Sequence, residues 1–294
     1  MATPKKLEAP TGHRAGNEPA WRIGGSFFPG AWKLKGWASI HLFLLLLMAV
    51  TPAILAQPSS FTPVPVAGYS NRYHSIYLEA KRHWQMDTNR AEVASEYAHA
   101  CFERGDYSAN DKERAALAEE GIAASHRAIA LDPKSAAARH YLGLNLGQLA
   151  RTKLFSALGL LDDMEATWKK SIELDEKFRF AAAHRSLGLL YLDAPGWPLS
   201  LGSRARARQH LKTAVELGPE YPDNQLCWLE ALLRWGEMKS VRSQLGTVED
   251  ILKTARAQFT GDAWSRDWLE WEDRWRKIKA KAAVVPARSP RGRQ

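Results

Sequence analysis

The chain has 294 residues, of which 45% are hydrophobic and 25% are charged, a composition that excludes an intrinsically disordered protein. Its two cysteines are too few for a disulfide scaffold and show no Cys-x-x-Cys spacing, so we expect neither a disulfide framework nor a zinc site. The net charge of +9 lies at the ends, with +4 in residues 1–56, +7 in residues 276–294 and −2 in the body between them. Because this near-neutral body lacks the basic face that binds phosphates, we expect no nucleic-acid partner.

Residues 1–56 are predicted to be a signal peptide. Residues 37–56 contain no Asp, Glu, Lys or Arg, and their apolar run follows a basic stretch and ends before the small residue Ala56, so cleavage would leave Gln57 as the mature N-terminus. The same stretch is about long enough to cross a bilayer as an uncleaved signal anchor, the one membrane attachment that we expect. Both interpretations place the body in the periplasm or the extracytoplasmic envelope, the second with an anchor in the inner membrane.

A Pro- and Ser-rich stretch, residues 57–72, is predicted to be a flexible tether, and an internal repeat follows it. Three similar hexapeptides end 43 residues apart, at Pro133, Glu176 and Pro219. Mostly small residues recur at two positions of the repeat, which lie seven residues apart: Gly121, Met164 and Ala207, and then Ala128, Ser171 and Ala214. Positions seven apart share one helical face, so we expect close helix–helix contacts there.

The motifs within the repeat point to a known family. Leu142-Gly143, Leu187-Gly188 and Gly105-Asp106-Tyr107, together with the prolines that end two of the units, resemble the tetratricopeptide-repeat (TPR) family over residues 74–257. The resemblance implies antiparallel helix pairs that stack into a right-handed α-solenoid. The spacing of 43 residues exceeds the usual repeat length of about 34, so each long unit carries about nine extra residues.

The fold class that we predict is therefore all-α, a solenoid of TPR-like helix pairs over residues 73–282. A half repeat covers residues 73–86, and four units cover residues 90–133, 135–176, 178–219 and 222–257. In the first unit, Asn110 and Glu113 offer an N-cap and its reciprocal partner. The third unit is interrupted by a projecting Pro-Gly-Trp-Pro loop whose Trp197 we expect to pack over its own helix pair. A last helix covers residues 262–282, and the basic residues 283–294 are predicted to be a disordered tail.

The last helix carries a stripe of four tryptophans, Trp264, Trp268, Trp271 and Trp275, which steps by 4, 3 and 4 residues and so occupies one face. We expect this face to cap the end of the solenoid. The alternative is an interfacial membrane helix, which the neighbouring acidic residues disfavour. Cys101 and Cys227 are expected to be buried, unpaired thiols.

No catalytic or phosphate-binding motif is present in the sequence, so we expect a protein that is not an enzyme and that has no cofactor or metal. A solenoid exposes a long concave surface, which favours a scaffold that binds a protein or peptide partner. A weaker similarity, to the periplasmic T component of tripartite ATP-independent transporters, implies a carrier of a small apolar ligand instead. A polar, open groove would favour the scaffold, and an apolar, enclosed tunnel would favour the carrier.

The resemblance also implies which residues face the groove, because the first helix of each TPR pair lies on the concave side. The groove positions carried over to this chain are His99, Phe102, His140, Gln148, Arg185, Glu230 and Arg234. They combine charges, amides and an aromatic ring, which suits a peptide better than a lipid. Truncating Arg185 or Arg234 is therefore expected to weaken partner binding with little effect on thermal stability.

Overall fold

A computed structural model of the chain describes residues 66–153, 157–196 and 198–283. The predicted signal segment, the new N-terminus at Gln57, the loop residue Trp197 and the basic tail from residue 284 lie outside the described residues. Those predictions therefore stay predictions.

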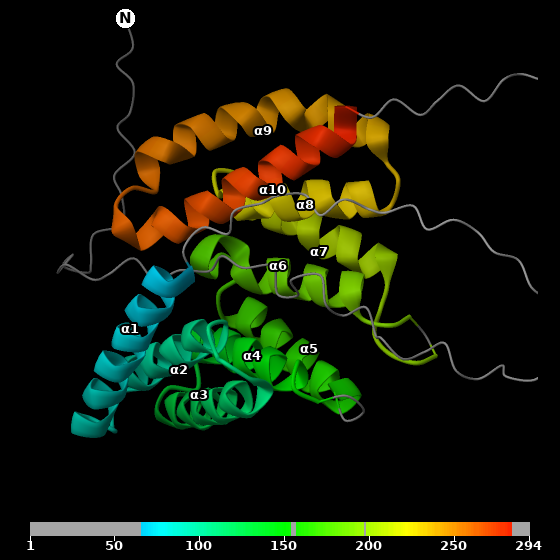
Figure 1. The fold of residues 1–294 in the computed structure, drawn as a ribbon. Helices are drawn as coiled ribbons and strands as arrows, with labels where there is room; N and C mark the ends of the chain where they lie inside the picture. Colours follow the sequence, from blue (N-terminus) through cyan, green and yellow to red (C-terminus); the bar gives the residue numbers. More distant parts are fainter. Residues whose placement is uncertain (1–65, 154–156, 197, 284–294) are drawn as a thin grey trace, which may run out of the picture.

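The described residues form ten α-helices and one short 3₁₀ turn, which confirms the all-α prediction (Figure 1). In chain order they are α1 (Val66–Met86), α2 (Ala91–Gly105), α3 (Asp111–Leu131), α4 (Ala136–Ala150), α5 (Ala157–Leu174), α6 (Phe178–Asp193), α7 (Arg204–Leu217), α8 (Pro222–Arg234), α9 (Met238–Gln258), η1 (Asp262–Trp264) and α10 (Ser265–Ala283).

The helix boundaries follow local signals in the sequence. The side chain of Asn110 accepts a hydrogen bond of 2.9 Å from the Glu113 N–H at the start of α3, and the Glu113 carboxylate accepts one of 2.7 Å from the Ala109 N–H. Ser135 caps α4 and Ser203 caps α7 in the same way. The predicted cap at Asn110 is thus confirmed. The reciprocal hydrogen bond to Glu113 comes from the N–H of Ala109, one residue before the expected donor, Asn110.

The pattern of helix contacts shows how the array curves. The first helices of successive units touch each other, α2 with α4, α4 with α6 and α6 with α8, whereas the second helices, α3, α5, α7 and α9, make no comparable contacts among themselves within the described residues. The array therefore curves with its first helices on the concave side, and we call α2, α4, α6 and α8 the inner helices. This is the arrangement that the resemblance to TPR proteins implies.

The small repeated residues lie at helix–helix contacts, as predicted. Ala128, Ser171 and Ala214 are each 0% exposed, and the residues seven positions earlier are also buried. Close helix packing also explains the glycines of the Leu-Gly pairs. A Cβ added at Gly143 would come within 2.9 Å of Trp168 Cδ1, and one added at Gly188 within 2.6 Å of Leu211 Cγ. Glycine is needed there because a bulky side chain of the second helix lies directly against the first helix.

The start of α6 departs from ordinary helical geometry. Arg179, Phe180 and Ala181 have φ values of 46°, 58° and 57°, so three consecutive residues that are not glycine adopt the left-handed conformation. Each such residue costs roughly 1–2 kcal/mol, which the surroundings must offset. Phe180 stacks on Tyr221 with ring centroids 4.7 Å apart, and its carbonyl oxygen accepts a hydrogen bond from Asn224.

The C-terminal tryptophan stripe closes the array, which confirms the capping helix. Trp268, Trp271 and Trp275 are buried against α8 and α9, and Trp264, in η1, is half-buried. The stripe is covered by the chain itself, so it is not presented to a membrane. No helix within residues 66–153, 157–196 and 198–283 is both long and apolar enough to cross a bilayer.

Candidate functional site

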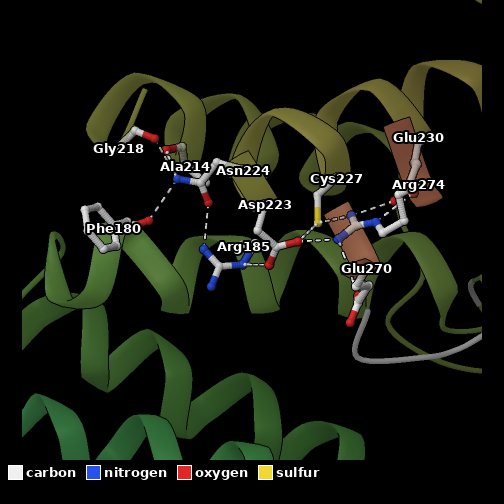
Figure 2. Close-up of polar contacts among 10 residues, drawn as sticks. All are labelled: Phe180, Arg185, Ala214, Gly218, Asp223, Asn224, Cys227, Glu230, Glu270 and Arg274. Atoms are coloured by element: carbon white, nitrogen blue, oxygen red, sulfur yellow. Dashed lines mark hydrogen bonds and ion pairs between the residues drawn. The ribbon is translucent and has the colours of Figure 1, made fainter. Parts of the chain in front are cut away.

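An ion network lies where α10 packs against α8 (Figure 2). Asp223, Cys227 and Glu230 lie on one face of α8, because they are spaced by four and three residues. The guanidinium of Arg274, from α10, donates two hydrogen bonds to the Glu230 carboxylate, at 2.9 and 2.8 Å. It also donates to Asp223 Oδ1 and lies 3.2 Å from Cys227 Sγ. The face of α8 that packs against α10 therefore binds a cation from the chain's own last helix.

A second guanidinium reaches the same carboxylate from α6. Arg185 Nε lies 3.0 Å from Asp223 Oδ2, and its Nη1 donates a 2.6 Å hydrogen bond to Asn224 Oδ1. Arg185 and Asp223 are each 2% exposed, so this pair lies in the interior. Burial alone would raise the pKa of Asp223, but Arg274 and Arg185 hold that pKa below its ordinary value. The carboxylate stays charged and joins α6, α8 and α10.

Both cysteines are buried, free thiols, as predicted. Burial raises the pKa of the Cys101 thiol to about 12, and burial with the nearby Asp223 raises the pKa of Cys227. Both thiols therefore stay protonated, and protonated thiols are poor nucleophiles. Within the described residues, no three His, Cys, Asp or Glu side chains are grouped so as to hold a metal ion.

The two ends of the array meet across the concave side. Arg72 Nη1, in α1, donates a 2.6 Å hydrogen bond to the carbonyl oxygen of Asp262 in η1. The Arg266 guanidinium, at the start of α10, lies 5.0 Å from the ring centroid of Tyr107 and within 4.0 Å of Asp106. Figure 1 shows the N-terminal end of α1 beside the start of α10. These contacts explain why α1 begins at Val66, seven residues before the predicted boundary, since its first turns have a surface to bind.

A pocket of about 250 Å³ remains on the concave side, at the N-terminal ends of the first three inner helices. Its lining includes Glu92, Glu96 and His99 from α2, Asp132 and Tyr141 from the turn before α4 and from α4, and Phe178 and Arg179 from α6. The aromatic rings form one wall, because the Tyr141 ring centroid lies 4.6 Å from that of His99 and 6.1 Å from that of Phe178. Of the lining carboxylates, Glu92 is exposed, and Glu96 and Asp132 are half-buried. The lining is thus polar and aromatic, not that of an apolar tunnel.

Of the residues predicted for the groove, His99 lines this pocket, and its Nε2 lies 3.6 Å from Glu103 Oε1. Phe102 is half-buried against the core. Arg234 is exposed and pairs with Asp193 at the opposite end of the inner helices. The placement of these three leaves their proposed contact with a partner untested.

The other predicted residues are buried or make contacts within the protein. His140 is 0% exposed, and burial, with the nearby Arg185, lowers its pKa well below the ordinary value. Gln148 is 2% exposed and donates a 2.8 Å hydrogen bond to Asp106. Arg185 and Glu230 belong to the network around Asp223 and Arg274. The prediction of an open groove position is therefore corrected at Arg185, because Asp223 and Asn224 hold its guanidinium in the interior, whereas Glu230 is half-buried beside α10.

Sequence reasoning missed Glu92, Glu96, Tyr141 and Phe178 as lining residues and Arg274 as a groove ligand. Glu96 and Glu92 lie one and two turns before the predicted groove residue His99 on the same helix, so helical spacing from His99 could have found them. Arg274 had no such signal, because only the three-dimensional crossing of α10 brings it to α8.

A histidine pair joins α6 to α7. The Nδ1 atoms of His184 and His210 are 3.0 Å apart, so one ring donates a hydrogen bond to the other. If both rings carried a proton on Nδ1, this hydrogen bond would be lost. Burial lowers the pKa of both rings. Further effects of His184, Lys169 and Arg206 bring the pKa of His210 to about 4.

No protein-family model and no curated protein matches this chain. Among solved structures, it is similar to the crystal structure of a thermophilic TPR protein from Thermus thermophilus, with a TM-score of 0.53 over 71% of this chain and 92% of that chain. The fold is a TPR fold. The two sequences are 16% identical, so the similarity concerns the fold alone. It agrees with the helix pairs, the inner helices and the repeated small residues described above.

Proposed function

We propose that the chain is an exported, non-enzymatic TPR scaffold that binds a protein or peptide partner on its concave side. The observation that supports this most is the pocket between α2, α4 and α6, which lies where the array curves inward and which α10 does not cover. TPR arrays generally present such concave surfaces to other proteins. The partner segment would lie across the first three inner helices.

The lining of the pocket favours a peptide over a small apolar ligand. Glu92, Glu96 and Asp132 place three carboxylates in the lining. An apolar ligand would remove these groups from water without replacing their hydrogen bonds, which costs free energy. A peptide supplies N–H groups and polar side chains instead. The scaffold is therefore better supported than the carrier.

The absence of enzymatic activity is also part of this proposal. The two thiols, the strongest potential nucleophiles among the described residues, are buried and protonated. Purified protein is not expected to form a covalent adduct with iodoacetamide in the folded state at pH 7. Rapid labelling of Cys101 or Cys227, measured by mass spectrometry, would contradict the statement that both thiols are buried and unreactive.

The proposed export can be tested by sequencing the N-terminus of the protein that its native cells produce. The signal segment predicts a mature chain that begins at Gln57 and is released into the envelope fraction. N-terminal sequencing of that fraction decides it. Recovery of an intact chain that sediments with the membrane through residues 37–56 would establish the anchor, and recovery from the cytosol would contradict export.

The binding face is tested by site-specific photo-crosslinking in native cells. A photoreactive amino acid is placed at Glu92, on the rim of the pocket, or at Lys212, an exposed residue of α7. We expect a crosslinked partner from position 92 and none from position 212, because α7 is a second helix on the convex side. A partner that crosslinks only from position 212 would move the site off the concave side.

A further inference from the structure

Basic side chains gather where the last turns of α10 lie beside the first turns of α9 (Figure 1). Arg242 Nε, in α9, donates a 2.8 Å hydrogen bond to the Ala282 carbonyl oxygen in α10, so the two segments are in contact. Residues 238–245 and 276–283 contain no Asp or Glu. They contain six basic residues, all exposed, which we call the basic end: Lys239, Arg242, Arg276, Lys277, Lys279 and Lys281.

Nearby carboxylates compensate only part of this charge. Asp273 forms ion pairs with two members of the basic end, and Glu249 Oε1 lies 3.8 Å from Lys279 Nζ. Glu237, at the start of α9, pairs with two arginines of α7 instead. Six positive charges therefore have two carboxylates as partners, and the basic end keeps a net positive charge.

The C-terminal residues of the chain add charge of the same sign. Residues 284–294, which lie outside the described residues, contain Arg288, Arg291 and Arg293 and no Asp or Glu. Because these residues directly follow α10, the chain itself keeps their charges close to the basic end.

We propose that the basic end binds the anionic headgroups of a lipid bilayer. Each Lys or Arg held near an anionic bilayer raises the partition coefficient about fivefold, so several exposed ones act together. Four of the six residues are lysines. Their point charges on long, flexible stems suit a surface of many headgroups better than the bidentate recognition of a single phosphate.

The tryptophan stripe takes no part in this contact. Trp268, Trp271 and Trp275 are buried against α8 and α9, whereas the lysines of the same helix face solvent. The chain would therefore lie on the headgroups without inserting an apolar face between the lipids.

The proposal goes beyond the proposed function, because it concerns α9 and α10 and not the pocket between the inner helices. The choice of a bilayer over a nucleic acid rests on the proposed export. Outside the cytoplasm, lipid headgroups are the more abundant anionic surface.

Vesicle flotation tests the proposal on residues 57–294, which contain every described helix. The probes are vesicles of phosphatidylcholine alone and vesicles that also contain phosphatidylglycerol, an anionic lipid. We expect the partition coefficient to be at least tenfold higher on the anionic vesicles at about 0.05 M NaCl, and the difference to be lost at about 0.5 M NaCl, because salt screens exposed charges.

A pair of matched variants links the binding to the basic end. Lys239→Gln/Lys281→Gln removes one charge from each helix and is expected to lower the partition coefficient on anionic vesicles at least tenfold. Lys112→Gln/Lys134→Gln removes the same charge from the first unit and its boundary with the second, and is expected to bind as the parent chain does. All four lysines are exposed, so both variants are expected to fold, which circular dichroism checks.

The C-terminal arginines give a further variant that alters no described helix. Replacing Arg288, Arg291 and Arg293 by glutamine is expected to weaken binding to anionic vesicles at least tenfold. This variant carries the test if the lysine variant does not fold.

The outcomes separate the two proposals. Equal partitioning onto both kinds of vesicle, binding that salt does not weaken, or equal losses in the lysine variant and its control would overturn the proposal. Tighter binding to a DNA duplex than to anionic vesicles at the same salt concentration would also overturn it. If the anionic vesicles bind as expected but native cells yield the protein in the cytosol, the lipid preference stands and the export fails.

Discussion

Replacing Gly143 by alanine tests whether the Leu-Gly pairs exist for close packing. In the interior of a helix, alanine is ordinarily better than glycine by about 1 kcal/mol. At Gly143, however, the new Cβ would lie within 2.9 Å of Trp168 Cδ1 and closer still to Nε1. Trp168 is 0% exposed, and its Nε1 donates a 3.2 Å hydrogen bond to the His140 carbonyl oxygen. The ring therefore cannot move aside without breaking this bond.

The expected size of the effect follows from these two opposing contributions. Overpacking of a tight core costs about 1–3 kcal/mol, and the contact here is at the severe end of that range. After the gain in helix propensity, the net loss is about 1–2 kcal/mol. For a domain of this size, that corresponds to a decrease in Tm of about 2–8 °C.

The assay is thermal and urea denaturation followed by circular dichroism, with Gly246→Ala as the matched control. Gly246 lies inside α9, and an added Cβ would meet nothing within 4 Å. The control is therefore expected to be more stable than the parent chain, by about 0.5–1 kcal/mol. If Gly143→Ala were as stable as the control, the glycine would not be required by the ring of Trp168, and the packing argument would be refuted.

Three further predictions use the same denaturation assays. Ala214→Leu is expected to destabilise the chain by about 1–3 kcal/mol, because Ala214 is 0% exposed at a helix contact, and an unchanged midpoint would contradict that packing. Arg185→Ala is expected to lower the free energy of unfolding by about 3 kcal/mol, because it breaks a buried ion pair. The exposed Arg234→Ala is expected to lower it by less than about 1 kcal/mol. For Arg185, this replaces the expectation of little effect on thermal stability. For His184 and His210, burial lowers both pKa values, so the unfolded chain binds more protons below pH 6.5. The free energy of unfolding is therefore expected to be highest above about pH 6.5 and to fall by about 1–3 kcal/mol towards pH 4. The variant His210→Asn is expected to lose less stability over this range. An equal loss in the variant would exclude the histidine pair as the cause.

Much of the fold could be predicted because its signals are local and recur. The 43-residue spacing placed Ala128, Ser171 and Ala214 at equivalent contacts, and Asn110 marked the start of α3. The site was less accessible to this reasoning. The burial of Arg185 depends on Asp223, 38 residues later in the chain, and the left-handed residues at the start of α6 likewise have no pattern in the sequence. The contact of Arg274 with α8 depends on how α10 packs against that helix.

The contact between α1 and η1 changes the kind of unfolding that this array can undergo. A linear array of repeats behaves as a row of neighbours, and its end repeats fray first because each has only one neighbour. Here the hydrogen bond from Arg72 to Asp262 and the cation–π contact of Arg266 with Tyr73 give the first and last helices each other as additional neighbours. Loss of either end then removes support from the other, so fraying at the two termini becomes a single coupled event, and the slowest-exchanging amides need not be confined to the middle units.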